Sequence, residues 1–333
     1  MKLVVTGSRG FLGSTLVPHL AALGHRGIAT GRQRPANLPS GWIGHLRGDL
    51  LGDSAPAIDD LGAIVHLEVK QHVPRPTAAD AREFAEVNVA GTRAWLDWAG
   101  RRGVSRFLLV SSIKAVAADS GPNLEDAPPE TVAAYGRSKA EAERAVCDWA
   151  AADPARSAVI LRPAPVYGPE NEANLAAFVR QILAGKPCLI GRGETRKSIV
   201  SLANLRGAIA FAIERDRPGY AVFNVSDRET PSLAELAAMI AETAGAGPPK
   251  RIPAWVAAAA APIGDAIESL TGRDFPLTTA RLRAIRETTI FPCDKLVAAG
   301  FVHPQTTRDG IAEMVAWPAG GGSGPYWTAI ISS

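Results

Sequence analysis

The glycine motif VVTGSRGFLG at residues 4–13 constrains the fold of this chain more than any other feature. An apolar run of strand type leads directly into Gly7, and a helix-like pattern begins after Gly10. Glycines at this point let the backbone approach a pyrophosphate, whose charge is stabilised at the N-terminus of the helix. The spacing is GxxGxxG, and the flanking strand and helix argue against the alternative of a glycine turn without a ligand. The motif predicts a dinucleotide-binding turn in which Gly7, Arg9, Gly10, Phe11, Leu12 and Gly13 contact the cofactor.

Short apolar segments alternate with helix-like segments through the first half of the chain. The apolar segments are rich in Val, Ile and Leu, which is typical of a parallel sheet covered on both faces. This alternation predicts an α/β fold with a Rossmann-type doubly wound parallel sheet. The expected strands are 2–7, 26–31, 63–68, 106–112 and 158–163, and the expected helices are 11–24, 78–101 and 135–152.

After about residue 165 the alternation becomes less regular. Further helices are expected at 175–184 and 203–214, and further strands at 198–202 and 221–226. Ser232, followed three residues later by Glu235, predicts a capping box at the start of another helix.

These patterns divide the chain into two predicted domains and a tail. The NAD(P)-binding Rossmann domain is expected to comprise 1–165 and about 198–228. A smaller C-terminal α/β substrate domain is expected to comprise about 166–197 and 229–317. Residues 318–333 lack periodicity, so a flexible tail is predicted there.

Composition excludes several classes of protein. The net charge is +3 with lysines and arginines spread along the chain, and only 6% of residues are aromatic, which argues against nucleic-acid binding. Cys147, Cys188 and Cys293 are scattered without metal-ligand spacing, which is typical of reduced thiols in the cytosol and indicates no metal site.

No membrane-targeting segment is expected. The chain opens directly into a strand without the charged and apolar regions of a signal peptide. The longest apolar stretch, residues 255–263, is interrupted by Pro262 and is shorter than the ~20 residues of a membrane span, although weak interfacial contact is left open. We therefore expect a cytoplasmic protein without a membrane span.

The end of the second predicted strand bears on the choice of cofactor. A site that prefers NAD places an acidic residue there for the ribose hydroxyls. This chain instead reads ATGRQRP at 29–35, with Arg32 and Arg34, so NADP is favoured slightly over NAD; a pair of surface arginines is the alternative. Asp49, followed by Leu50, lies between the strands expected at 26–31 and 63–68, where contact with the adenine is expected.

A serine pair and a tyrosine–lysine pair suggest acid–base chemistry. Ser111 and Ser112 end a predicted strand at the carboxyl edge of the sheet, where ligands bind in such folds, and Ser112 is the first candidate. Tyr135 and Lys139 are four residues apart, so they share one face of a helix. A lysine ammonium beside a phenol favours the phenolate and is expected to lower its pKa from ~10, giving a base for a substrate hydroxyl. The alternative is an ordinary amphipathic helix with a solvated face.

The ordered motifs resemble the extended short-chain dehydrogenase/reductases, specifically the NAD-dependent epimerase/dehydratase branch and its UDP-sugar 4-epimerase-like members. The resemblance covers about residues 1–317 and rests on TGSRGFLG, NVAGT (88–92), SS (111–112), YGRSK (135–139) and LRPAPVYGP (161–169). It implies Tyr135 as catalytic base, Ser112 as its hydroxyl partner and Lys139 as the lysine that binds the nicotinamide ribose. Further cofactor contacts are implied for Leu67, Asn88, Pro163 and Val166, and substrate contacts for Asn174, Leu175 and either Lys197 or Arg196.

Two departures from the family pattern concern the site. Glu68 and Val69 replace small residues at the end of the strand expected at 63–68, so Glu68 is expected either to alter how the cofactor lies or to reach solvent. Residues 116–118 read VAA where the family frequently has VYG. His66 lies within a strand pattern and is expected to be packed or on the surface and not catalytic, and Trp95 and Trp98 are expected in the core.

The function implied first is a nucleotide-sugar 4-epimerase, in which Tyr135 deprotonates the 4-hydroxyl and hydride passes to NAD(P)⁺ and back. The alternative is an NADP-dependent reductase or dehydrogenase of a keto-sugar, hydroxysteroid or other secondary alcohol. A dehydratase is disfavoured because Ile113 and Lys114, and no acid, follow Ser112. A non-catalytic NADP-binding regulator ranks last, since such relatives commonly lack the tyrosine–lysine pair. The resemblance also implies that a homodimer can form through the helices at 83–101 and 135–152.

Overall fold

The computed structural model describes residues 1–52, 59–73, 75–119, 121–169, 171, 174–215, 217–271, 275 and 277–317, together with the backbone but not the side chain of Asn174. The tail predicted at 318–333 lies outside the described residues. Among the described helices, none is long and apolar enough to cross a bilayer.

Seven parallel strands form the central sheet. Their spatial order is β10-β6-β5-β4-β1-β2-β3. Successive strands are added toward one edge from β1 to β3 and toward the other edge from β4 onward, and ligands bind at this switch point between β1 and β4 in doubly wound folds. The Rossmann-type sheet predicted from the sequence is therefore confirmed. The strands are β1 (Lys2–Thr6), β2 (Arg26–Gly31), β3 (Trp42–Leu46), β4 (Leu61–His66), β5 (Arg106–Val110), β6 (Ser157–Pro163) and β10 (Gly219–Val225).

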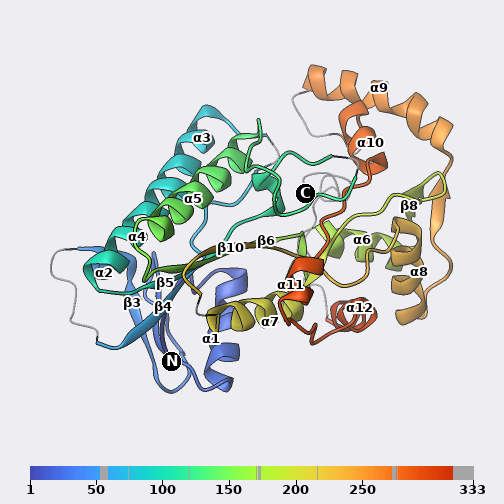
Figure 1. Cartoon of the computed structure of the whole chain (residues 1–333). Helices are drawn as coiled ribbons and strands as arrows, with labels where there is room; N and C mark the ends of the chain where they lie inside the picture. Colours follow the sequence, from blue (N-terminus) through green and yellow to red (C-terminus); the bar gives the residue numbers. More distant parts are fainter. Residues whose placement is uncertain are drawn as a thin grey trace.

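Helices cover both faces of this sheet (Figure 1). One face carries α1 (Phe11–Ala22) and α7 (Leu202–Ile213). The other carries α4 (Gly91–Arg101) and α5 (Ala134–Ala151), beside α2 (Arg47–Leu51) and α3 (Ala78–Phe84). Along β1 the side chains alternate between the two cores, because Leu3 and Val5 pack toward α1 while Val4 packs toward α4. Trp95 and Trp98 are fully buried in the second core, as predicted.

Several boundaries differ from the sequence expectations; β4, for example, spans Leu61–His66 where 63–68 was expected. The helix expected over 78–101 is interrupted by a π-helical turn, η1 (Ala85–Ala90), between α3 and α4. Strand β5 ends at Val110, so Ser111 and Ser112 lie beyond the sheet, followed by the 3₁₀ turn η2 (Ile113–Ala115). The strand expected over 198–202 is reduced to β9 (Val200–Ser201), because α7 already begins at Leu202.

The remaining elements form a smaller layer beside the sheet, on the right of Figure 1. Helices α6, α8 and α12 share a core with β8, and α8 begins at the predicted Ser232–Glu235 capping box. Phe291, Leu296 and Phe301 instead join the core between α1, α7 and the sheet, although the sequence assigns them to the substrate domain; the domain division itself stays a prediction. The elements are β7 (Val166–Tyr167), α6 (Asn174–Leu183), β8 (Pro187–Ile190), α8 (Leu233–Thr243), β11 (Lys250–Ile252), α9 (Ala254–Thr271), α10 (Thr279–Arg286), α11 (Asp294–Ala298) and α12 (Thr307–Ala316).

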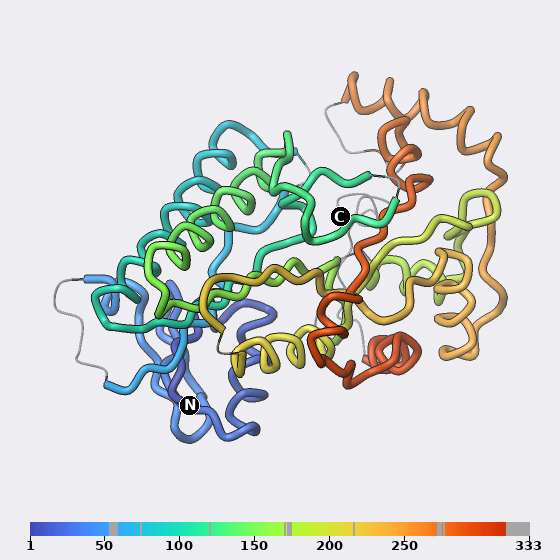
Figure 2. The backbone as a smooth tube through the Cα atoms, viewed as in Figure 1, coloured from blue at the N-terminus to red at the C-terminus, as the bar shows by residue number. Residues whose placement is uncertain are grey.

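Two short sheets accompany this layer. Strand β8 pairs with β11, and β7 pairs with β9. The backbone trace in Figure 2 shows that the chain leaves the central sheet after β6 and returns to it with β10. The apolar stretch at 255–263 forms the first half of α9, which stands at the edge of the molecule.

Candidate active site

The glycine turn between β1 and α1 is shaped for close backbone approach. Gly7 has a φ of +62°, and a Cβ there would lie 2.9 Å from the backbone nitrogen of Glu68. A Cβ on Gly13 would lie 2.5 Å from the carbonyl oxygen of Gly7, so this glycine lets α1 pack against the turn. At Gly10, among the described residues, only that same oxygen, at 3.2 Å, would come within 4 Å of a Cβ. The first and third glycines are thus required by packing, while the second leaves a space in which a dinucleotide pyrophosphate fits.

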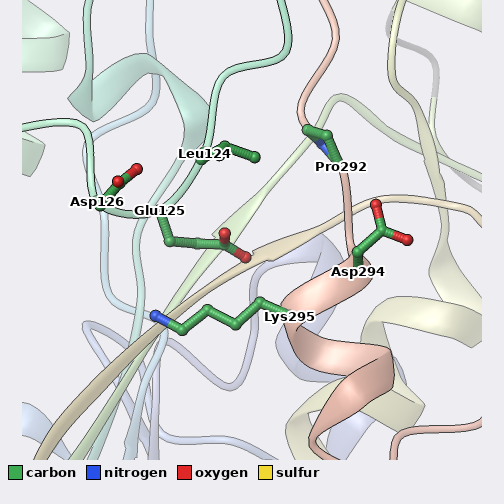
Figure 3. Close-up of a pocket in the computed structure, with 6 residues that line it drawn as sticks. All are labelled: Leu124, Glu125, Asp126, Pro292, Asp294 and Lys295. Atoms are coloured by element: carbon green, nitrogen blue, oxygen red, sulfur yellow. The ribbon is translucent and has the colours of Figure 1, made fainter.

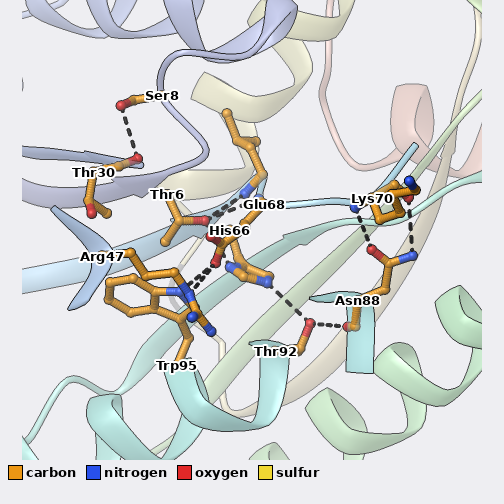
Figure 4. Close-up of polar contacts among 11 residues, drawn as sticks. Thr6, Ser8, Thr30, Arg47, His66, Glu68, Lys70, Asn88, Thr92 and Trp95 are labelled. Carbon is orange, nitrogen blue, oxygen red and sulfur yellow. Dashed lines mark hydrogen bonds and ion pairs between the residues drawn. The ribbon is translucent and has the colours of Figure 1, made fainter. Parts of the chain in front are cut away.

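A hydrogen-bond network at the end of β4 supports this turn (Figure 4). The Thr6 hydroxyl accepts bonds from the backbone N–H groups of Leu67 and Glu68, at 3.1 and 3.2 Å. His66 Nδ1 lies 2.8 Å from the same hydroxyl, and its Nε2 lies 3.1 Å from the hydroxyl of Thr92. His66 is fully buried, and burial lowers its pKa to about 3, so the ring is neutral at pH 7. The prediction that His66 is a packed histidine is confirmed.

Glu68, the departure noted in the sequence, is paired inside the protein. Its Oε2 accepts hydrogen bonds from Arg47 Nε at 2.9 Å and from Trp95 Nε1 at 3.1 Å (Figure 4). The side chain is 13% exposed. The expectation that Glu68 reaches solvent is wrong, because α2 and α4 supply the cation and the donor that hold it.

Asn88 joins the segment after β4 to helix α5. Its side-chain oxygen accepts from the backbone N–H of Lys70 at 2.8 Å, and its amide donates to the Ser138 hydroxyl at 2.8 Å. Asn88 lies in the π-helical turn η1 and is almost completely buried. Such turns are frequent at functional sites, since they re-aim side chains that a regular helix would place elsewhere.

Ser112, Tyr135 and Lys139 converge at the carboxyl end of β5. The Ser112 hydroxyl lies near enough to Tyr135 to act on the pKa of its phenol, and it accepts the N–H of Lys114 at 3.2 Å. Lys139 Nζ donates to the carbonyl of Val110, the last residue of β5, at 2.9 Å. Tyr135 is 9% exposed and Lys139 is 2% exposed. The two helix residues are therefore held over the same strand end that carries the serine.

Burial sets the ionisation of both helix residues. It raises the pKa of Tyr135 to about 12, although the Ser112 hydrogen bond acts in the opposite direction. It lowers the pKa of Lys139 to about 8, opposed by the negative charge of Glu143. The expectation that the lysine lowers the phenol pKa below its usual value is wrong for the chain by itself, because desolvation of the phenolate outweighs the favourable contacts.

Three residues around Tyr135 are absent from the sequence expectations as site residues. The rings of His72 and Phe84 contact the phenol edge-on, with centroids 5.8 and 5.7 Å away. Burial and the positive charge of Lys114 lower the pKa of His72 to about 4, and burial lowers that of Lys114 to about 8. The position of Lys114, two residues after Ser112, could have indicated from the sequence that it lies near the site. The contact of His72 with Tyr135 arises only from the fold.

A buried ion pair lies one helical turn beyond Lys139. Glu143 accepts three hydrogen bonds from Arg162 on β6, the shortest at 2.7 Å, and one from the Ser111 hydroxyl. Glu143 and Arg162 are 1% and 2% exposed. The pair and its bond to Ser111 therefore link α5 to the carboxyl ends of β5 and β6. Its signal in the sequence is the spacing of Tyr135, Lys139 and Glu143, four residues apart on one helix face.

The arginines after β2 lie at the surface. Arg34 forms an ion pair with Asp49, 3.6 Å apart, and Arg9 hydrogen-bonds to Gln33. Arg32 is exposed, while the side chain of Leu50 is fully buried in the core. A cationic surface thus borders the end of β2 beside the glycine turn, with no acid in residues 29–35.

The remaining predicted residues are spread over the second half of the chain. Pro163 ends β6 and Val166 begins β7, while Leu175 packs on the core around α6 and α8. Asn174 begins α6, and its side chain lies outside the described residues. Of the two basic candidates, Lys197 is half-buried with Nζ 3.5 Å from the Thr289 hydroxyl, whereas Arg196 binds Glu235 and the carbonyl of Thr230. Arg196 is thus engaged at the N-terminus of α8, which leaves Lys197 as the stronger candidate.

A separate cavity of about 320 Å³ lies beside β10, lined by Leu124, Glu125, Asp126, Pro292, Asp294 and Lys295 (Figure 3). Glu125 accepts the backbone N–H of Asn224 there, at 3.0 Å. This cavity contains none of the predicted site residues.

Comparisons with known proteins agree with this architecture. The sequence profile of the NAD dependent epimerase/dehydratase family matches residues 3–226. The N-acetyl-α-D-glucosaminyl-diphospho-ditrans,octacis-undecaprenol 4-epimerase of Escherichia coli O157:H7 is 27% identical over 277 residues, covering 81% of this chain and 80% of the relative. The UDP-glucose 4-epimerase of Vibrio cholerae is 31% identical over 245 residues, covering 71% and 73%. The structure of MoeE5 in complex with UDP-glucose and NAD superposes with a TM-score of 0.71 at 26% identity, covering 95% of this chain and 98% of that one.

Proposed function

Because this chain belongs to the NAD dependent epimerase/dehydratase family, whose members include enzymes of the extended short-chain dehydrogenase/reductase type, we propose that it is a nucleotide-sugar 4-epimerase. The observation that carries the proposal is the convergence of Ser112, Tyr135 and Lys139 at the end of β5. The relatives that epimerise C4 of a UDP-linked or diphospho-lipid-linked sugar support this choice of reaction.

The chain's residues fit a dinucleotide cofactor, NAD or NADP. The backbone at Gly7, Gly10 and Gly13 would hold the pyrophosphate, and Lys139 would hold the nicotinamide ribose. When bound, the cofactor accepts a hydride from the sugar and returns it. Asn88, Leu67, Pro163 and Val166 border the same region and are proposed as further contacts, with Phe11, Leu12 and Arg9 beside the turn.

Tyr135 would take the proton of the sugar 4-hydroxyl. A phenol with a pKa of about 12 is too weak an acid to be ionised at pH 7, so the catalytic state requires added positive charge beside it. Lys139 is already present when the pKa of Tyr135 is about 12, so the further charge would come from the oxidised nicotinamide ring, and the Ser112 hydroxyl would stabilise the same oxygen. The proton would return to the sugar oxygen from Tyr135 at the end of the cycle.

The nucleotide half of the substrate is assigned to the layer beside the sheet. Lys197 is a half-buried cation suited to a pyrophosphate, and Asn174 and Leu175 begin the neighbouring helix α6. The structure of MoeE5 with UDP-glucose supports a nucleotide-sugar ligand for a chain of this fold.

The test is incubation of the purified protein with UDP- and dTDP-sugars, with and without NAD or NADP. We expect the C4 epimer to form without net reduction of the cofactor, measured by chromatography of the sugars and absorbance at the reduced nicotinamide band. Tyr135→Phe is expected to lower kcat by about 10²- to 10⁴-fold, the range of a general base.

Tyr220→Phe is the matched control, since this tyrosine is 56% exposed on β10, and it should leave the rate unchanged. Retention of full activity by Tyr135→Phe would contradict the mechanism.

A second function, an NADPH-dependent reductase of a keto-sugar or another ketone, is favoured by one observation. Arg32 and Arg34 follow β2 without an acid, which suits the 2′-phosphate of NADP. Stoichiometric oxidation of NADPH by a ketone substrate, with no epimer formed, would support this function over the first.

Cofactor preference is tested with Arg32→Ala. A lost charge-assisted contact is expected to weaken NADP binding by about tenfold or more, with little change for NAD. Isothermal titration with both cofactors measures this, with Arg93→Ala as a control at another exposed arginine. Equal losses for NAD and NADP would show that Arg32 does not read the 2′-phosphate.

A further inference from the structure

Helix α9 is more apolar than a surface helix of a globular protein should be. Its 18 residues, AWVAAAAAPIGDAIESLT, include only two charged side chains, Asp265 and Glu268. A helix that is apolar all round is normally buried on every side. Figures 1 and 2 show α9 at the periphery, away from the central sheet, and the packing partners found for it among the described residues lie on one side.

The side of α9 that faces the protein is formed by small residues. Ala257 and Ala261 are buried in a cluster with Leu282 of α10, beside Ile252 and Leu277. A Cβ on the next inward residue, Gly264, would lie 1.9 Å from the carbonyl oxygen of Leu277. This inner side already has its packing partners.

The opposite side of α9 carries its large apolar side chains into solvent. At 100° per residue, the positions of the exposed apolar residues named below fall within roughly a third of the helix circumference. Trp255, Ile263 and Leu270 are 75%, 62% and 86% exposed. We call this face the outer stripe, and its exposed members are Trp255, Ala259, Pro262, Ile263, Ala266 and Leu270.

The charges around the outer stripe favour a negatively charged partner. Both acids of α9 are turned to neighbouring segments: Asp265 accepts the backbone N–H of Thr279 at 3.1 Å, and Glu268 binds Arg281 and Arg75. Exposed basic residues lie on the two elements that adjoin α9, namely β11 and α10, and the exposed acids in the same region are Asp265 and Glu287. These basic residues are Lys250 and Arg251 before α9, and Arg283 and Arg286 on α10.

We propose that the outer stripe of α9 docks this protein on an anionic lipid bilayer, with the helix lying in the plane of the interface. An exposed apolar stripe with a tryptophan at one end and basic flanks is the pattern of an interfacial helix, and 18 residues give ~27 Å of contact. A second copy of the chain is the less favoured occupant, because stable protein interfaces use about 20 to 30 residues a side and the stripe offers six.

Residues in the segment after β4 contact both α9 and Tyr135 of the candidate active site. Arg75 is paired with Glu268 of α9, and His72, three residues earlier, contacts the ring of Tyr135. The docking proposal does not rest on the proposed catalytic function, because it can be measured without substrate or cofactor.

The test is flotation of the purified full-length chain with vesicles of phosphatidylcholine alone or containing 30% phosphatidylglycerol. We expect the wild type to float with the anionic vesicles and to be released by high salt. The variant Trp255→Ser/Ile263→Ser/Leu270→Ser should bind at least about tenfold more weakly, since three partly buried apolar side chains are lost from the interface.

Leu23→Ser/Tyr220→Ser/Val302→Ser is the matched control, because these side chains are 55%, 56% and 82% exposed elsewhere on the surface, and it should float like the wild type. Thermal unfolding of both variants establishes that they are folded. Failure of the wild type to float with anionic vesicles, or equal losses in both variants, would overturn the proposal. So would light scattering that shows a wild-type dimer which the stripe variant dissociates, because the stripe would then be an interface between copies.

Discussion

At the scale of single residues, the sequence predicts which side chains come together at the candidate site but not their ionisation. The spacing of Tyr135 and Lys139 predicts a shared helix face, and both side chains lie over the end of β5. Their pKa values, about 12 and about 8, depend on near-complete burial by segments far away in the chain. Burial of that extent is a tertiary property, so a local motif cannot report it.

Glu143 is expected to keep Lys139 protonated. Its charge raises the pKa of Lys139 against the effect of burial, so Glu143→Gln should move that pKa below about 8. If activity requires the ammonium form, the alkaline limb of the rate–pH profile should shift to lower pH. The substitution also leaves Arg162 buried without its partner, so the free energy of unfolding should fall by about 3 kcal/mol.

The measurements are kcat/KM between pH 6 and 10 and urea unfolding. Glu141→Gln, at an exposed position two residues earlier, is the control and should change neither quantity. If the Glu143→Gln protein is folded and its alkaline limb is not shifted, Glu143 does not control the ionisation of Lys139.

At the scale of elements, the sequence predicts which segments are helices and strands better than where they end. Helix α5 and strand β2 lie within one residue of their expected ranges. The helix expected over 78–101 is instead interrupted by η1, because Asn88 is held by Lys70 and Ser138, which lie in other segments. The expectation that Glu68 reaches solvent fails for the same reason, since Arg47 and Trp95 contact it from α2 and α4, while an altered cofactor position stays a prediction.

The first turn of α5 lies tightly against the segment that carries Ser112. A Cβ on Gly136 would lie 2.3 Å from the carbonyl oxygen of Lys114 and 2.4 Å from Thr131 Cγ2. Gly136→Ala should therefore displace Tyr135 from Ser112 and lower kcat by at least about tenfold, because misplacement of reacting groups by even 1 Å can cost up to about 10²-fold. Steady-state kinetics and circular dichroism distinguish this effect from loss of folding.

Gly100→Ala serves as the control for the same change within a helix. A Cβ there would meet only Arg156 Nη2, at 3.8 Å, so this variant should be fully active and slightly more stable. Equal activity of the two variants would mean that the contact of α5 with Lys114 does not position the tyrosine.

At the scale of the whole molecule, the β–α alternation was sufficient to predict the doubly wound sheet. The layer beside the sheet was harder to predict, because β8 pairs with β11 across some sixty residues and such pairings leave little local pattern. Helices α9 and α10 were likewise absent from the expected elements. The homodimer through 83–101 and 135–152 stays a prediction.

The burial of His66 makes the free energy of unfolding depend on pH. Its pKa is lowered from 6.5 to about 3, so between these values the unfolded chain binds a proton that the native chain excludes. Stability should therefore be complete above pH 6.5 and fall as the pH drops toward 3, by at most about 1.4 kcal/mol per pH unit from this group.

His66→Asn removes the titrating ring, so its unfolding free energy should depend less steeply on pH in this window than that of the wild type. Chemical denaturation at several pH values between 3 and 7 provides the slopes. His45→Asn, at a partly exposed position on β3, is the control and should keep the wild-type slope. Identical slopes for wild type and His66→Asn would show that His66 is not the group responsible.

The position of β10 has a consequence for how the protein is made. Strand β6 ends at Pro163, but its outer neighbour β10 begins only at Gly219, so about fifty residues must be translated before that edge is paired. During this interval the nascent chain presents an apolar strand with unpaired backbone groups, the kind of edge that recruits other chains. A fragment that stops near residue 165 would keep this edge permanently, and we expect it to aggregate on expression, whereas one extended through β10 should be recovered in the supernatant.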